Sequence, residues 1–343
     1  IYQRFREFFQ ERTADVGVEP LLEEMLRYAR YYAQFLLGRG GNDAVSAALA
    51  RLARLSEASA VLVLRLSECR HDLGSLTELD FVNALELLES FVFRRVVCGL
   101  QTRGYWGRFS GIAYRIPDEA PLLRLKVELA RQPLAYRFPP NDEFQNELLT
   151  RPLYGMRTCH FMLDRLENHR NKEPSDTSSF TVEHILPQNP NLSGSWREML
   201  GDDWEELHPQ WVHRFGNLTL TGYNSTYSDR PFDEKKTIKG GFSESSVRLN
   251  RFVREQPRWG IEQIEVRGAN LASHALEIWV PLVVADEAVS AVEKEDLQRS
   301  AARRTAEAVP MSKRAREFLN SLRPAIEVLG TVIEKGENKS VSY

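Results

Sequence analysis

Two adjacent residues, Glu183 and His184, have side chains that could carry out chemistry. A carboxylate is a ligand for hard cations, and a neutral imidazole accepts a proton near pH 7. Two asparagines, Asn217 and Asn224, follow them in the chain. A lone histidine beside a carboxylate is most often a surface or core residue, but this combination is much rarer. Neighbouring side chains on a strand point to opposite faces, yet the coming Pro187 favours a bend that would let Glu183 and His184 line one pocket.

Two short strands and a helix must position these residues. Residues 179–182 and 217–221 are predicted as strands, and residues 230–239 as a helix with Pro231 in its first turn. The interval 189–215 is rich in tryptophan and acidic residues, which predicts short helices inserted between the strands.

The first half of the chain has the apolar spacing of amphipathic helices, and Asn42 or Asp43 is a suitable cap for the second of them. The predicted helices cover about residues 22–36, 44–66, 80–98, 122–130, 141–149 and 154–168. Composition becomes that of a linker after residue 172. We therefore predict a mostly α-helical α+β fold with a helical scaffold domain over 1–172, a second domain over 173–282 and a helical tail over 283–343.

The segment Glu183-His184-Ile185-x-Pro187 resembles the HNH, or His-Me finger, nuclease motif, in which Asp-His-Ile-x-Pro is common. The runs 216–220, 224–232 and 234–236 are similar to the C-terminal nuclease module of GmrSD-type restriction proteins. SspE-like, phosphorothioate-dependent antiphage proteins are built similarly. The helical segment before the motif is also similar to these proteins, notably at residues 87–95 and Phe144. The resemblance therefore covers about residues 45–280.

The resemblance implies a ββα-metal core over residues 179–240 and a metal-dependent DNA endonuclease that nicks or cuts phage DNA in prokaryotic defence. It implies that His184 is the general base that activates water, and that Glu183 and Asn224 hold one Mg²⁺ or Mn²⁺ ion. It also implies that Asn217 fixes the loop through hydrogen bonds from its side chain to the backbone. Glu183 departs from the usual Asp or His and reaches one methylene further than Asp.

Several basic residues are candidates for contact with DNA phosphates. Lys235 and Lys236 could reach a scissile phosphate or lie on a solvated helix face. Arg248 and Arg251 begin a series with Arg254 and Arg258 whose spacing predicts one basic stripe along a helix. A solvated helix laced with salt bridges explains the same spacing equally well.

Three further residues near the motif have competing interpretations. Asp229 is expected to cap the helix ahead of Pro231 rather than to bind metal. His208 and His213 are expected to be structural or exposed, because no cysteine or further histidine lies at zinc-site spacing.

Overall composition is that of a folded protein. The 343 residues carry 45 basic and 48 acidic side chains, a net charge of −3, so any contact with DNA must be local. Three cysteines without a CxxC pair disfavour a disulfide framework and favour a reducing cytoplasm. The apolar runs are shorter than the roughly 20 residues that cross a bilayer, so no membrane partner is expected. The first residue is Ile1, which indicates a fragment of a longer protein.

Two alternatives to the nuclease remain open. The finger could only dock on DNA as a non-catalytic, regulatory module. The helical half could mainly hold an N-terminal nucleotide-hydrolysing domain, with which the resemblance pairs this module. The second alternative is compatible with nuclease activity.

Overall fold

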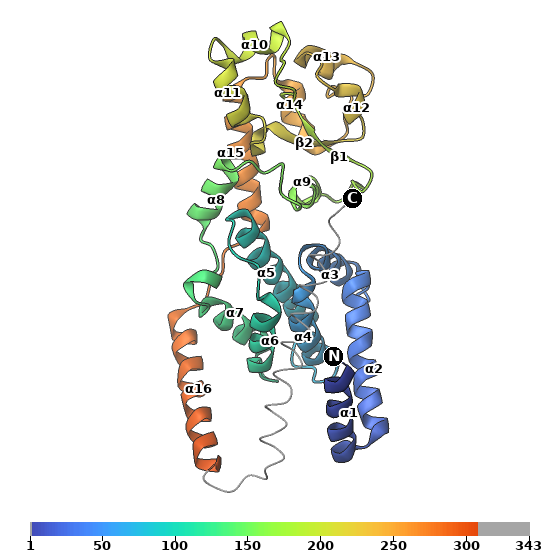
Figure 1. Ribbon diagram of the computed structural model, residues 1–343, viewed down its shortest axis with the longest axis vertical. Coiled ribbons are helices and arrows are strands. Elements are labelled where there is room, and N and C mark those ends of the chain that lie inside the picture. The colour runs from blue at the N-terminus through green and yellow to red at the C-terminus, as the bar shows by residue number, and fades with distance from the viewer. Residues whose placement is uncertain (1, 308–343) are drawn as a thin grey trace. The chain divides into compact units, whose positions relative to one another are not determined.

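The computed structural model describes residues 2–307, which are mostly helical and contain one sheet of two strands (Figure 1). This composition agrees with the predicted α+β class. The chain divides into two compact units. The first unit contains the described residues up to 96, residues 100–138 and residues 282–307, and the second contains residues 97–99 and 139–281.

The division differs from the predicted domains in two places. The described part of the predicted separate tail, residues 283–307, belongs to the first unit. The second unit begins at Pro139, so the predicted boundary at residue 172 falls inside it. The reason is packing: α8 (Asn141–Thr150) and α9 (Cys159–Asn168) contact α15 (Ile261–Ile278) of their own unit. The polar stretch after residue 172 is therefore a loop within a unit. Residues 308–343 of the predicted tail lie outside the described residues.

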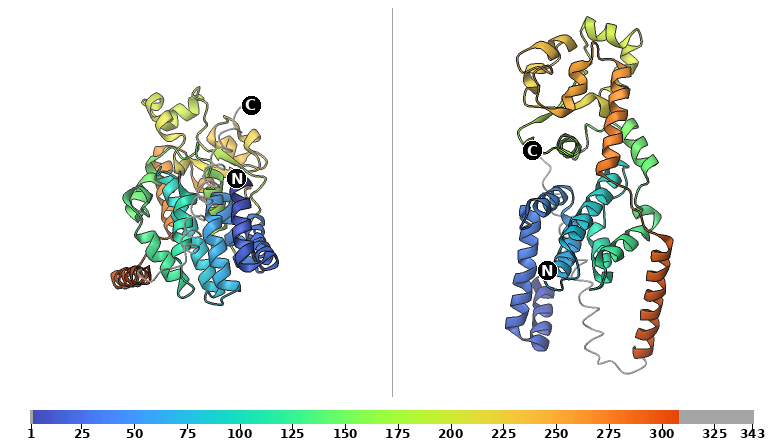
Figure 2. Two further views of the ribbon diagram at one scale, coloured as in Figure 1. Left: turned by 60° about the horizontal axis from the view of Figure 1, so that its bottom comes forward. Right: turned by 180° about the vertical axis from the view of Figure 1, so that it is seen from behind.

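The first unit is helical throughout its described part. Its core is a cluster of buried apolar side chains that includes Leu52, Leu62, Leu66, Phe91 and Phe109. α16 (Asp286–Glu307), the dark orange helix of Figure 2, contacts α7 (Pro121–Ala130). Asp296 accepts hydrogen bonds there from Arg124 at 2.7 Å and Arg131 at 2.9 Å. The elements are α1 (Tyr2–Val16), α2 (Val18–Leu37), α3 (Asp43–Leu55), η1 (Glu57–Ser59), α4 (Ala60–His71), α5 (Glu78–Val97), α6 (Tyr105–Arg115), α7 (Pro121–Ala130), η2 (Leu134–Tyr136) and α16 (Asp286–Glu307).

The predicted helix over 44–66 is two helices. Ser56 adopts an extended conformation at φ −158° and ψ 106°, which ends α3, and the short η1 turn precedes α4. Both helices then pack against α2. The predicted cap is confirmed, because the Asn42 side chain accepts a hydrogen bond from the Val45 amide at 2.8 Å.

The second unit is built on an antiparallel pair of strands, β1 (Thr181–His184) and β2 (Leu218–Thr221). Trp196 and Trp259 are fully buried in its core beside Phe232 and Tyr227. The remaining elements are α10 (Gly194–Leu200), α11 (Trp204–Trp211), η3 (Phe215–Asn217), α12 (Asn224–Tyr227), α13 (Phe232–Thr237), η4 (Arg248–Asn250) and α14 (Arg251–Glu255). The short helices expected between the strands are thus α10 and α11.

Two predicted helices of this unit are shorter than expected. The pattern over 230–239 corresponds to α13, which starts after Pro231, and the separate short helix α12 precedes it. The pattern over 154–168 corresponds to α9 alone, and residues 154–158 form a turn region before it.

Close packing joins the hairpin to α15. A Cβ atom at Gly216 would lie 1.8 Å from the carbonyl oxygen of Ile264, so the backbone of η3 touches the backbone of α15. The buried guanidinium of Arg267 donates to the carbonyl oxygens of Gly216 at 2.7 Å and Leu218 at 2.8 Å. These contacts fix the start of β2 against the helix. None of the described helices is both long and apolar enough to cross a membrane.

Candidate active site

Glu183 and His184 lie on opposite faces of β1. The strand continues through His184, with Glu183 opposite Thr219 and His184 opposite Leu218 in β2. Successive side chains of an extended strand alternate between its faces, so no bend brings the carboxylate and the imidazole into one pocket. The expectation of a shared pocket is therefore not met in this structure.

Lys235 neutralises the Glu183 face. Its ammonium donates to Glu183 Oε1 at 2.7 Å and to the carbonyl oxygens of His184 at 2.9 Å and Ile185 at 3.2 Å. The Lys235 side chain is 0% exposed, so it neither reaches a phosphate nor lies on a solvated helix face, the two predicted alternatives. Its position follows from α13, whose buried side packs under the end of β1.

Burial governs both charges of this pair. It raises the pKa of Glu183 to about 7, although the Lys235 charge and hydrogen bond lower it, and the Asp229 charge adds to the rise. Burial also lowers the pKa of Lys235 against the opposing effect of Glu183. The pair is a desolvated ion pair with three hydrogen bonds on its cation.

Asn224 joins the Glu183 face of the hairpin. Its Nδ2 atom donates to Thr181 Oγ1 at 3.1 Å and to the Val182 carbonyl at 3.0 Å. Thr181 and Glu183 are two residues apart on β1 and so share a face. The Asn224 amide oxygen is left to bind other groups.

Asp229 has a different contact from the predicted one. Its Oδ2 atom accepts a hydrogen bond from Asn189 Nδ2 at 2.8 Å, and Pro231 occupies the N-cap position of α13. Asp229 therefore does not cap this helix. Its charge still raises the pKa values of Glu183 and Lys235.

Two side chains on this face carry oxygen atoms of the kind that hard divalent cations prefer. Glu183 supplies a carboxylate and Asn224 an amide oxygen, and such ligands suit Mg²⁺ or Mn²⁺ better than zinc. Among residues 2–307 no group of three or more His, Cys, Asp or Glu side chains is placed to hold a metal ion. A cation here would use the two side chains with water, and would compete with Lys235 for Glu183.

His184 lies among rings on the other face. Its Nε2 atom is 3.0 Å from Nδ1 of His213, and the edge of the Tyr154 ring packs on it with centroids 4.3 Å apart. Tyr154 also stacks on His213 at 5.4 Å. His184 is only 3% exposed, and its burial, with smaller effects from the charges of His213 and Lys235, lowers its pKa to about 3. The imidazole is thus neutral and covered by Tyr154 and His213.

Sequence reasoning missed two of these neighbours. His213 was expected to be structural or exposed, yet it is half-buried and bonded to His184. Tyr154 lies in the segment between α8 and α9, and no motif identifies it. The other histidine is structural as expected, because the buried His208 Nε2 lies 2.7 Å from the Pro187 carbonyl.

Asn217 locks the loop that follows β1. Its side chain accepts from the Leu186 amide at 2.7 Å and from Trp259 Nε1 at 3.1 Å. It donates to the carbonyl oxygens of Leu186 at 3.0 Å and Val212 at 2.8 Å. This fully buried side chain holds loop backbone, which is the geometry of the role expected for it.

The remaining basic candidates are dispersed. Lys236 donates to the Gln256 carbonyl at 2.6 Å, and Arg248 donates to the carbonyl oxygens of Glu167 at 3.1 Å and His169 at 3.0 Å. The predicted single helical stripe is not formed, because α14 ends at Glu255 and Arg258 binds the Met199 carbonyl instead. Arg251 is exposed and has no hydrogen bond or ion pair with another described residue.

Comparison with known proteins gives one family. Residues 138–274 match the family model described as the C-terminal domain of GmrSD restriction endonucleases. This part of the chain is thus similar to the C-terminal domain of GmrSD restriction endonucleases, and it corresponds closely to the second compact unit. No curated protein matches the chain.

Proposed function

We propose that the GmrSD-type domain of this chain is a metal-dependent DNA endonuclease of the HNH, or His-Me finger, class that serves prokaryotic defence in the cytoplasm. The observation that carries the proposal is the neutral His184 at the end of β1, next to a loop locked by Asn217, in a domain of a restriction endonuclease family. The order β1, β2, then α12 and α13 supports a ββα arrangement.

His184 acts as the general base in this proposal. The contact between its Nε2 atom and His213 fixes the orientation of the ring, which leaves Nδ1 to take a proton from water. Tyr154 covers the ring in this structure, so the approach of a phosphate requires that Tyr154 moves aside. Exposure to solvent would also relieve the burial that lowers the His184 pKa.

Glu183 and Asn224 are the residues that would hold Mg²⁺ or Mn²⁺. When bound, such an ion supplies charge stabilisation for a phosphate oxygen and the leaving oxygen. The part of this chain is to present two oxygen ligands on one face of β1 and to hold them there through Thr181 and Lys235.

The test is nicking of supercoiled plasmid by the purified full chain with Mg²⁺ or Mn²⁺. We expect nicking that a chelator abolishes and that His184→Ala reduces by about 10²–10⁴-fold, the usual contribution of a general base. His71→Ala, which changes an exposed histidine of the first unit, is the matched control and should leave the rate unchanged. Equal nicking by His184→Ala and the parent chain would disprove the assignment of His184.

A second function is favoured by a specific observation. Lys235 already neutralises Glu183, and His184 is covered by Tyr154, as expected of a finger that only docks on DNA. Such a module binds DNA but leaves supercoiled plasmid uncut with either metal. The plasmid assay therefore separates the two functions.

The helical unit supports a partner role. Four apolar residues of α2 are exposed at helical spacing, which leaves one apolar face of this helix in solvent: Val18, Leu22, Met25 and Leu26. We assign this face to a nucleotide-hydrolysing domain. The double substitution Leu22→Glu/Leu26→Glu should abolish co-purification of that domain while leaving the melting temperature unchanged, and unaltered co-purification would refute the assignment.

A further inference from the structure

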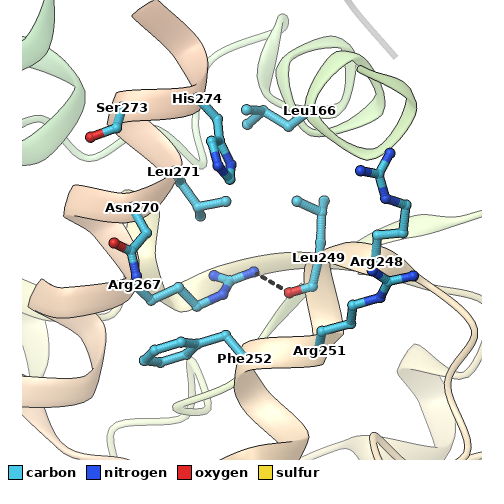
Figure 3. Close-up of a pocket in the computed structure, with 10 residues that line it drawn as sticks. All are labelled: Leu166, Arg248, Leu249, Arg251, Phe252, Arg267, Asn270, Leu271, Ser273 and His274. Carbon is cyan, nitrogen blue, oxygen red and sulfur yellow. Dashed lines mark hydrogen bonds between the residues drawn. The ribbon is translucent and has the colours of Figure 1, made fainter. Parts of the chain in front are cut away.

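A cavity of about 380 Å³ lies in the second unit, away from Glu183 and His184 (Figure 3). α15 forms one side, and η4 with α14 forms another, where Arg248 and Arg251 are found. Its volume is in the range of pockets that hold small organic ligands. The lining residues are Leu166, Arg248, Leu249, Arg251, Phe252, Arg267, Asn270, Leu271, Ser273 and His274.

The lining is strongly positive. Three arginines contribute to it, and no aspartate or glutamate is among the lining residues. The buried Glu167, next to the lining residue Leu166, uses both carboxylate oxygens to accept from the backbone amides of Arg248 at 2.8 Å and Leu249 at 2.9 Å. Arg251 is exposed and unpaired among the described residues, so its guanidinium is available to a ligand.

Arg267 provides a second, independent sign of a missing anion. It is 1% exposed, and its three hydrogen bonds go to the carbonyl oxygens of Gly216, Leu218 and Leu249. Its Nε atom is buried without a hydrogen-bond partner. Burial lowers the pKa of this guanidinium to about 9. Buried charges are normally paired, and no carboxylate of the described chain pairs with this one.

The rest of the lining suits an organic body rather than a bare ion. Leu166, Leu249 and Leu271 give apolar walls, and the imidazole of His274 points between Leu166 and Leu271 in Figure 3. Asn270 and His274 are one turn apart on α15 and add hydrogen-bonding groups. A flat heterocycle with polar edges matches such a surface.

We propose that this cavity binds a nucleoside monophosphate, either free or as the terminal unit of a strand. Arg251 and Arg248 bind the phosphate, because a guanidinium group can donate two parallel hydrogen bonds to phosphate oxygens. The leucine walls receive the base, and Asn270 and His274 bind its polar edge. The charge of Arg267 beneath the cavity adds to the attraction for the phosphate.

The test is to measure ligand affinity by calorimetry on the full chain with a chelator present. Because the chelator prevents metal-dependent cleavage, the result does not depend on nuclease activity. The ligands are deoxyadenosine 5′-monophosphate, deoxyadenosine, inorganic phosphate and a short single strand with or without a 5′-phosphate. We expect the mononucleotide to bind at least about tenfold more tightly than phosphate or nucleoside alone. Preference for the free nucleotide or for the phosphorylated strand decides the source of the ligand.

Arg251→Glu should weaken mononucleotide binding by about tenfold or more, because it removes a charged hydrogen bond and adds repulsion. Arg254→Glu makes the same change on the same short helix outside the cavity lining and should bind like the parent chain. Equal affinity for phosphate and mononucleotide, equal losses in Arg251→Glu and Arg254→Glu, or absence of mononucleotide binding would each overturn the proposal.

Discussion

The two faces of β1 solve the burial of a polar side chain in different ways. On one face Glu183 contacts Lys235 in a salt bridge, and on the other His184 is neutral among Tyr154 and His213. Both side chains are 3% exposed. The first solution needs an opposite charge, whereas the second needs only that the ring loses its proton. Residues adjacent in sequence can therefore require unrelated surroundings.

Removal of the cation should give the largest change in stability. Lys235→Met leaves the Glu183 carboxylate buried without its partner, which costs about 3–5 kcal/mol of the free energy of unfolding. Glu183→Gln/Lys235→Met should recover at least about 1 kcal/mol of this loss, because no unpaired charge remains. Denaturant titrations at neutral pH measure both values.

Lys239→Met is the matched control for this experiment, because Lys239 is exposed just beyond α13. Its free energy of unfolding should stay within about 0.5 kcal/mol of the parent chain. Equal stability of the single and double variants would show that the charge pair does not organise this face.

The second largest loss of stability is expected at Asn217, which holds the loop that follows β1. Asn217→Ala removes a buried side chain that satisfies the amide and carbonyl of Leu186, which costs about 1–3 kcal/mol. Asn189→Ala removes two exposed hydrogen bonds, one to Asp229 and one from the Asn191 amide, and should cost less than about 0.5 kcal/mol. Similar losses in the two variants would mean that Asn217 does not lock the loop.

The two faces should respond to pH with opposite signs. His184 binds its proton less tightly in the folded chain, so its contribution to stability grows as pH rises from about 3 to 6.5. Glu183 binds its proton more tightly in the folded chain, so its contribution falls as pH rises from about 4.5 to 7. Each group contributes a slope of at most about 1.4 kcal/mol per pH unit.

Two variants distinguish the pH dependence due to His184 from that due to Glu183. The free energy of unfolding is measured by urea titration at a series of pH values with a chelator present. His184→Gln should flatten the rise on the acid side, and Glu183→Gln should remove a decline toward neutral pH. The same sign of change in both variants would contradict the comparison between the faces.

The smallest effect on stability is expected for Tyr154→Ala, because this ring is 37% exposed. We expect a loss of about 1 kcal/mol or less from the ring contacts, together with faster modification of His184 by diethyl pyrocarbonate. Tyr114→Ala, at an exposed tyrosine of the first unit, should leave that rate unchanged. An unchanged rate in Tyr154→Ala would show that Tyr154 does not cover the histidine.

The sequence was sufficient for features that depend on local pattern. The second strand and the cap at Asn42 follow from residue type and spacing, whereas the first strand lies two residues later than the predicted 179–182. The backbone bonds of Asn217 were expected from the family resemblance. Placement of Lys235 required a long-range partner, since 52 residues separate it from Glu183 and the motif gives the lysine no sign of burial. The expected bend before Pro187 was outweighed by the ladder of β1, which keeps His184 paired with Leu218.

Errors in the helices have the same origin. Apolar spacing continues through Ser56, but the backbone there is extended, and separate α3 and α4 both reach α2. Periodicity reports which residues face a core and carries no information on whether the chain turns between them. Tyr154 shows the limit most clearly, because only the folded chain brings it to His184.

Gly216 allows the backbone at the start of the hairpin's second strand to pack directly against the backbone of α15. With the Ile264 carbonyl 1.8 Å from the place of a first side-chain carbon, nineteen of the twenty amino acids are too large for this position. Random replacement of codon 216 followed by selection for folded protein should therefore return glycine alone. A design that transfers the hairpin to another scaffold would have to include α15 as well.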